Sequence, residues 1–141
     1  MRLTEAVGTA TTLPAVYEAA LHGLKDGFGV DRASILLFDP DGVMRFKAWR
    51  GVSDAYRAAV EGHTPWSPGQ APPDPIVVSD ITADPSLAAY LPVFQREQIA
   101  SLAFVPLISD GGVIGKFMLY GDRPRALAWE ELAAARAIGF L

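Results

Sequence analysis

Residues 100–120 read ASLAFVPLISDGGVIGKFMLY. Two apolar runs of strand length, residues 100–108 and 113–120, are joined by the turn residues Ser109-Asp110-Gly111-Gly112, a combination typical of a β-hairpin. Both faces of each predicted strand are largely apolar, so both must be covered by protein. The hairpin is therefore expected in the middle of a sheet, with one layer packed above it and another below. Pro106 is unusual in such a strand and is expected at a bulge or where the neighbouring strand ends.

The composition describes one globular domain. The chain has 141 residues, half of them hydrophobic, which suffices for one core but not for two ordinary domains. The formal net charge is −4, so no broad cationic surface is expected for nucleic acid. The absence of cysteine excludes disulfides, thiolate metal sites and thiol catalysis. No apolar run approaches the ~20 residues of a membrane span and no signal peptide opens the chain, so a cytoplasmic location without a membrane segment is expected.

The first third of the chain predicts a helix followed by a second hairpin. Residues 13–28 place apolar side chains three and four positions apart, as on the buried stripe of a helix. Residues 32–39 and 43–49 flank the turn Pro40-Asp41-Gly42. The second of these runs alternates, which is typical of a strand near a sheet edge, with one face expected to carry Met44, Phe46 and Ala48. Trp49 falls on the polar side, where it either covers the neighbouring basic side chains or is covered by the segment that follows.

The middle segment predicts a covering layer of short elements. Residues 53–60 read as a short helix, and residues 75–80 as a short strand. Between them, residues 63–74 hold Trp66 among several prolines, which favours an ordered irregular crossing. Trp66 is interpreted as a plug that closes the core or, alternatively, as the wall of a ligand pocket. Asp84-Pro85 predicts a helix start, with an interruption at Pro92.

The end of the chain predicts a closing helix over residues 129–138, with acidic residues in its first turn. The helical pattern continues to Phe140-Leu141 without a stop signal, so residues 1–141 are expected to be one domain of a longer multidomain protein. The predicted fold class is α+β. It has a central antiparallel sheet, the N- and C-terminal helices packed on one face, and the loops and short helices of the middle segment on the other.

At these positions the chain resembles the GAF family. The matching pieces are Asp31–Phe38 with Asp41-Gly42, Pro75–Asp80, Phe104–Leu107, Gly112–Tyr120 and Trp129–Leu132. The resemblance runs from about Leu13 to Leu141 and is especially close to GAF modules that precede the transmitter region of bacterial sensor histidine kinases. It implies a non-catalytic sensory domain of a two-component signalling protein. By this resemblance a small molecule sits between the sheet and the middle loops, while the terminal helices form a homodimer and pass a signal to an output domain in the same polypeptide.

Several better-known GAF activities require particular residues, and most of these residues are missing from this sequence. Bilin-binding members attach their chromophore through cysteine and methionine sulfoxide reductases of this fold need cysteine, but this chain has none. The cyclic-nucleotide phosphodiesterase type carries an Asn-Lys pattern, and this chain contains no asparagine. Haem-binding members need an axial histidine. Only His22 and His63 are candidates, and His22 is expected to face the paired helices, which leaves His63. The cofactor is therefore unknown from the sequence.

A ligand, where one binds, is expected between the middle segment and the sheet face that it covers. The predicted ligand-binding residues are Trp66, Asp80, Leu91, Phe94, Leu102, Phe104, Met118 and Tyr120. The alternative is that these side chains fill the core and that the domain is a ligandless dimerisation and relay module. Asp80 is also expected to cap the turn at Thr82 or Ala83. Since no histidine, acid and nucleophile have a spacing that suggests catalysis, neither a catalytic nor a metal site is expected.

Overall fold

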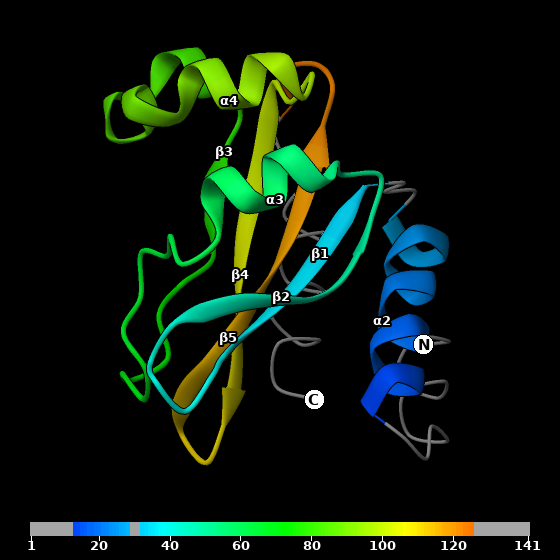
Figure 1. The fold of residues 1–141 in the computed structure, drawn as a ribbon, viewed down its shortest axis with the longest axis vertical. Coiled ribbons are helices and arrows are strands. Elements are labelled where there is room, and N and C mark those ends of the chain that lie inside the picture. Colours follow the sequence, from blue (N-terminus) through cyan, green and yellow to red (C-terminus); the bar gives the residue numbers. More distant parts are fainter. Residues whose placement is uncertain (1–12, 29–31, 126–141) are drawn as a thin grey trace.

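The computed structural model of the protein describes residues 13–28 and 32–125 (Figure 1). The elements in chain order are α2 Leu13–Phe28, β1 Ala33–Phe38, β2 Met44–Arg50, α3 Asp54–Val60, β3 Ile76–Val78, the 3₁₀ helices η1 Ile81–Ala83 and η2 Pro85–Tyr90, α4 Leu91–Arg96, β4 Ser101–Ser109 and β5 Gly112–Gly121. The predicted helix at residues 13–28, both hairpins and the short elements between them are confirmed. No helix within the described ranges is both long and apolar enough to cross a bilayer.

The strands form one antiparallel sheet in the order β2-β1-β5-β4-β3. The β4–β5 hairpin lies inside this sheet, as predicted, because β1 pairs with β5 and β3 pairs with β4. Asp110 and Gly111 join the two strands with φ angles of 51° and 75°. Left-handed angles at both positions are what a two-residue turn needs to match the twist of its strands, which explains the Asp-Gly sequence.

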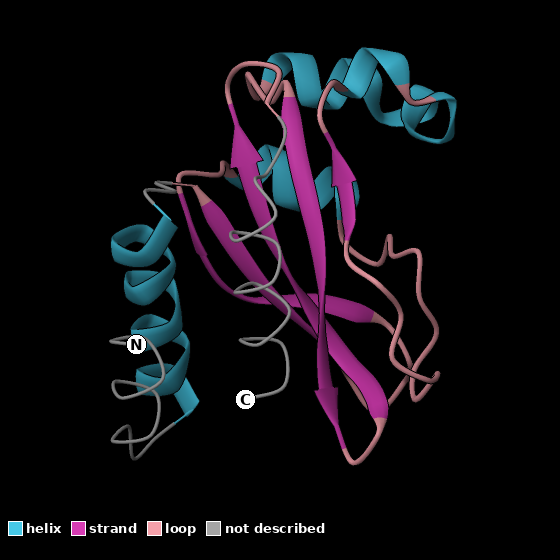
Figure 2. Ribbon diagram, turned by 180° about the vertical axis from the view of Figure 1, so that it is seen from behind, coloured by secondary structure: helices cyan, strands magenta, loops and turns pink. Residues whose placement is uncertain are grey.

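The two faces of the sheet carry separate cores. Phe117 and Leu119 of β5 pack on one face with Leu21 of α2. The side chains between and after them, Met118 and Tyr120, pack on the other face beneath α3 and α4. Figure 1 views the face that α3 covers, and Figure 2 shows the sheet from behind, with α2 against β1 and β2. The central hairpin is thus covered on both sides. The predicted closing helix at residues 129–138 lies outside the described residues.

The edge strand β2 departs from the predicted alternation. Met44 and Phe46 pack on the α3 face, whereas Ala48 packs on the α2 face. The pairing with β1 explains this, because Ile35 lies opposite Ala48 while Leu36 lies opposite Phe46, leaving an extra residue in β2. Such a bulge reverses the faces of all residues beyond it. The expectation that Ala48 shares a face with Met44 was therefore wrong.

Trp49, beyond this bulge, is 39% exposed and is only partly covered by the segment that follows it. The guanidinium carbon of Arg57 in α3 lies 3.8 Å from the centre of its ring, a cation–π arrangement. Pro106 is accommodated because β3 pairs only with Leu102, Ala103 and Phe104, so the neighbouring strand has ended before it. For Trp49 the structure supports partial cover by the following segment. For Pro106 it supports both expectations, because the β4–β5 register also shifts one residue further on, between Leu107 and Ile108.

The middle segment forms the layer over the α3 face, and its ends are fixed by local hydrogen bonds. The Ser53 hydroxyl oxygen accepts from the amide of Tyr56 at 3.1 Å and caps α3. Asp84 caps η2, and Pro92 lies in the first turn of α4, so the predicted interruption is the boundary between two short helices. Trp66 is 6% exposed and belongs to the core, which supports its interpretation as a plug.

Candidate functional site

A small cavity lies between the sheet and the layer that covers it. Its volume is about 20 Å³, which is room for about one water molecule. Strands β1, β2, β4 and β5 contribute one side of it, and α3, α4 and the segment after α3 contribute the other. The lining residues are Leu36, Phe46, Tyr56, Val60, His63, Phe94, Phe104, Lys116, Met118 and Tyr120.

The structure brings half of the predicted ligand-binding residues to this cavity. Those that line it are Phe94, Phe104, Met118 and Tyr120. Those that do not line it are Trp66, Leu91, Leu102 and Asp80. Trp66 and Leu102 are buried in the same core, and Leu91 packs against that core. Asp80 Oδ1 accepts from the Thr82 amide at 2.9 Å and so caps η1, as expected. Ligand binding by any of the eight stays a prediction.

Lys116 is the charged side chain of the cavity. It lies in the middle of β5 and is 3% exposed. Its Nζ donates a hydrogen bond to the backbone carbonyl of His63 at 2.9 Å and lies 5.0 Å from the centre of the Phe104 ring. Burial lowers the pKa of this amine to about 7, because a low-dielectric interior disfavours the ammonium form. In residues 13–28 and 32–125 no carboxylate forms an ion pair with it.

Two tyrosines supply further polar groups of the cavity. The Tyr120 hydroxyl lies 3.0 Å from the Ser34 hydroxyl, and both residues are buried. The Tyr56 ring stands edge-on to the Tyr120 ring, with 5.7 Å between their centres and 87° between their planes. Burial raises the pKa of Tyr120 to about 12 and also raises the pKa of Tyr56. Both side chains are therefore neutral phenols near neutral pH.

His63 lies where the irregular crossing leaves α3. Its ring is half-buried and stacks at a tilt on Tyr90 of η2, with 4.5 Å between the ring centres. Burial, and secondarily the charge of Lys116, lowers the pKa of His63, so the imidazole is neutral near pH 7. The other histidine, His22, is exposed on α2, and its Nε2 lies 3.1 Å from a carboxylate oxygen of Asp26. Haem ligation by His63 stays a prediction.

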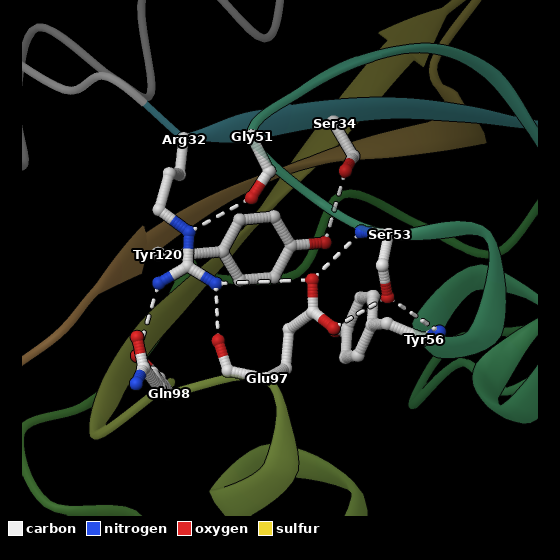
Figure 3. A network of polar contacts seen from close by, with 8 residues as sticks. All are labelled: Arg32, Ser34, Gly51, Ser53, Tyr56, Glu97, Gln98 and Tyr120. Atoms are coloured by element: carbon white, nitrogen blue, oxygen red, sulfur yellow. Dashed lines mark hydrogen bonds and ion pairs between the residues drawn. The ribbon is translucent and has the colours of Figure 1, made fainter.

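A polar network around Arg32 adjoins the cavity (Figure 3). The Arg32 guanidinium donates to three backbone carbonyls: those of Gly51 at 3.0 Å, Glu97 at 2.7 Å and Gln98 at 3.0 Å. The carboxylate of Glu97 accepts from the amide and the hydroxyl of Ser53, at 2.7 and 2.6 Å. Because Ser53 caps α3 and Glu97 follows α4, the network joins the start of one covering helix to the end of the other.

The same network reaches the central strand and the cavity wall. Tyr120 of β5 donates its amide hydrogen to the carbonyl of Arg32 at 3.1 Å, and Ser53 holds the amide of Tyr56. Both tyrosines line the cavity. Arg32 itself precedes β1, the first strand after α2. The cavity wall is therefore tied by hydrogen bonds to Arg32, at the start of β1.

A model of the GAF domain family matches residues 12–140. The chain belongs to the GAF family. The fold class and the resemblance predicted from the sequence are both confirmed. One similar solved structure is a domain of a Sinorhizobium meliloti 1021 protein assigned as a two-component sensor histidine kinase. It is 42% identical over 92% of this chain and 88% of that chain, with a TM-score of 0.84.

More distant GAF domains share the fold. That of a phosphoenolpyruvate-protein phosphotransferase from Coxiella burnetii is 19% identical over 97% of this chain and 83% of that chain, with a TM-score of 0.75. The blue-light absorbing form of the Thermosynechococcus elongatus PixJ GAF domain is 16% identical over 92% and 85%, with a TM-score of 0.67. No curated protein sequence matches this chain.

The cavity of this GAF domain combines a few polar groups with a mostly apolar lining. The cavity offers one amine, two phenols, a neutral imidazole and apolar walls. Within the described part of the chain, no group of three or more histidine, cysteine or acidic side chains is arranged to hold a metal ion. GAF domains are in general regulatory sensory modules, and this set of side chains is consistent with such a role.

The residues of this GAF site that sequence reasoning missed include the polar side chains Lys116, Tyr56, Arg32 and Glu97. A signal existed for the first two. Lys116 precedes Met118 and Tyr120 by two and four positions, so strand alternation puts it on their face. Tyr56 lies four positions before Val60 on the buried stripe of the helix predicted over residues 53–60. Arg32 and Glu97 carried no local signal, because their bonds join distant parts of the chain.

Proposed function

We propose that this GAF domain is a non-catalytic sensory module of a bacterial two-component signalling protein, a sensor histidine kinase in the cytoplasm. Its output domain belongs to the same, longer polypeptide. The cavity on the α3 face responds to a small molecule, and the terminal helices, which pair two copies of the chain, pass the response on. The 42% identity to a domain of an assigned sensor histidine kinase supports this class of protein.

The observation that carries the proposal is the hydrogen-bonded connection between the cavity and Arg32, the residue that precedes β1. Tyr56 and Tyr120 line the cavity, and both are held by backbone bonds to members of the Arg32 network. Charge-assisted bonds such as those of Arg32 and Glu97 are stronger and more directional than bonds between neutral groups. A displacement of the cavity wall is therefore expected to reach Arg32, at the start of β1, through a route of a few hydrogen bonds.

The test is autophosphorylation of the full-length kinase with substitutions at the two ends of this route. Phe104→Leu alters the cavity wall, and Glu97→Gln weakens the network without touching the cavity. Each is expected to change the autophosphorylation rate by about fivefold or more, the usual size of an allosteric coupling. The control Lys47→Gln, on edge strand β2, is expected to leave the rate unchanged. Equal rates in all four proteins, each folded by circular dichroism, would refute the relay.

A second candidate is a ligandless dimerisation module, and the small cavity favours it. About 20 Å³ is far below the few hundred Å³ of an ordinary ligand pocket. Native mass spectrometry of freshly purified protein separates the two functions. A small molecule that is released on denaturation supports the sensor. A dimer that releases no small molecule, and whose kinase ignores Phe104→Leu, supports the ligandless module.

A further inference from the structure

Lys116 is a buried base that no acid of the described chain neutralises. Lysine is almost never fully buried unless it is paired, because removing an ammonium group from water is costly. Here the residue is 3% exposed, and none of the ion pairs in residues 13–28 and 32–125 includes it. Its one hydrogen bond goes to a neutral carbonyl, that of His63. When the Lys116 amine is protonated, its positive charge is therefore not balanced by a carboxylate of the described residues.

The same side chain lines the cavity, so a bound molecule has access to it. A protonated amine has three donors, and the His63 carbonyl occupies one of them. The neighbouring walls are the apolar side chains of Phe104 and Met118 and the neutral phenols of Tyr56 and Tyr120. An apolar chamber with a single cation at its wall matches a ligand that has one anionic group and a short hydrocarbon part.

We propose that the cavity binds a small organic carboxylate, whose carboxylate group pairs with Lys116 Nζ and whose carbon atoms pack on Phe104 and Met118. This inference names the ligand class of the proposed sensory function and rests on it. Formate and acetate are the smallest carboxylate probes. Because the cavity holds about one water molecule, even these anions require the half-buried His63 to move. A phosphate dianion is disfavoured, since no second lysine or arginine lines the cavity in the described part of the chain.

Carboxylate binding is expected to take up protons. The titratable groups that face Lys116 are His63 from the segment after α3, Tyr56 from α3 and Tyr120 from β5. Near pH 7 these three are neutral, because the pKa of His63 is lowered and the pKa values of both tyrosines are raised. Burial lowers the pKa of Lys116 to about 7, so a share of the molecules holds a neutral amine near that pH. An arriving anion raises this pKa and draws in a fraction of a proton per site.

The experiment is a titration of the purified chain with sodium formate and sodium acetate. Formamide and acetamide, which have a similar shape but no charge, are the control ligands. Nuclear magnetic resonance follows the Met118 methyl group, and calorimetry in buffers of different ionisation enthalpy counts the protons. Saturable binding of a carboxylate with proton uptake is expected, and Lys116→Met is expected to weaken it by about tenfold or more. Lys47→Met, which removes a lysine outside the cavity, is expected to leave it unchanged.

Three results would overturn the proposal: no saturable binding of either carboxylate, equal binding of carboxylates and amides, or undiminished carboxylate binding by Lys116→Met. None of them bears on the kinase response to Phe104→Leu and Glu97→Gln, which tests the sensory function separately. Unfolding of Lys116→Met is not expected to confuse the result, because an apolar side chain of similar length replaces a buried, uncompensated amine. Its urea unfolding curve verifies that the variant is folded.

Discussion

Lys116→Met is expected to raise the free energy of unfolding at neutral pH. The pKa of this amine falls from an ordinary value of 10.5 to about 7 in the fold. A gap of about 3.5 pH units corresponds to ~5 kcal/mol, the ceiling on what burial of this amine costs at pH 7 and below. Methionine removes that cost but leaves the buried His63 carbonyl without its donor, a loss of about 1–3 kcal/mol. A net stabilisation of at most about 2–4 kcal/mol is expected.

The dependence of this difference on pH has a definite sign. In the unfolded chain the amine keeps its proton up to about pH 10.5, whereas in the fold it loses the proton near pH 7. Between these values the unfolded chain binds more protons, so the stability of the wild-type protein rises with pH by up to about 1.4 kcal/mol per pH unit. Lys116→Met lacks this rise. Its advantage is therefore largest at and below pH 7 and disappears as the pH approaches 10.5.

Urea unfolding monitored by tryptophan fluorescence, at several values from about pH 6 to about pH 10, measures both effects. The control is Lys47→Met on β2, whose amine pairs with Asp39 at 2.6 Å near the surface. Its loss is expected to cost up to about 1 kcal/mol without a comparable trend in pH. Two results would refute this expectation. One is that Lys116→Met has a lower free energy of unfolding than the wild-type protein at pH 7. The other is that the difference in unfolding free energy between Lys116→Met and the wild-type protein is the same at every pH.

Three further predictions follow from close contacts. Tyr120→Phe leaves the buried Ser34 hydroxyl without its partner and is expected to lower the free energy of unfolding in urea by about 1–3 kcal/mol. Adding Ser34→Ala is expected to restore part of this stability, and simple additivity of the two single losses would contradict the expectation. Gly115→Ala makes the added Cβ atom clash with the Leu36 carbonyl oxygen, so the melting temperature is expected to fall by several degrees, corresponding to about 1–3 kcal/mol. An unchanged melting temperature would exclude the close approach of β1 and β5 at this glycine. Asp80→Ala removes the cap of η1 and is expected to cost about 1 kcal/mol without changing acetate binding; weakened binding would instead assign Asp80 to the site.

The features of the fold that the sequence predicted have local causes. The Asp110-Gly111 turn follows from the two left-handed positions that a tight hairpin requires, and the Asp84-Pro85 helix start follows from a cap and a fixed φ angle. The bulge in β2 has a non-local cause. It arises from the pairing with β1, where Ile35 and Leu36 face partners two positions apart, and nothing within residues 43–49 marks it.

The residues of the candidate site also divide into those whose placement has a local cause and those whose placement depends on the whole fold. Phe94, Phe104, Met118 and Tyr120 were predictable in part, because a helical stripe and strand alternation set which side chains share a face, while the structure shows that this face lies beneath the covering layer. Lys116 obeys the same alternation, but its charge suggests a solvent-exposed position, and only the packed structure shows that the strand is covered there. The Arg32 network was not predictable, since its partners are mostly backbone carbonyls, whose positions depend on the whole fold.

A ligand can shift a protein between two conformations only if it binds one of them more tightly than the other. Tyr56 links the cavity to the Arg32 network, because its ring lines the cavity while its amide is held by Ser53 (Figure 3). A carboxylate that enters beside Lys116 and displaces this ring acts on the start of α3, and through Ser53 on the Glu97 carboxylate. The carbonyl of Glu97 in turn holds Arg32. Since these bonds share their partners and are charge-assisted, we expect them to shift together, which transmits the displacement to β1 without any contact between the ligand and α2.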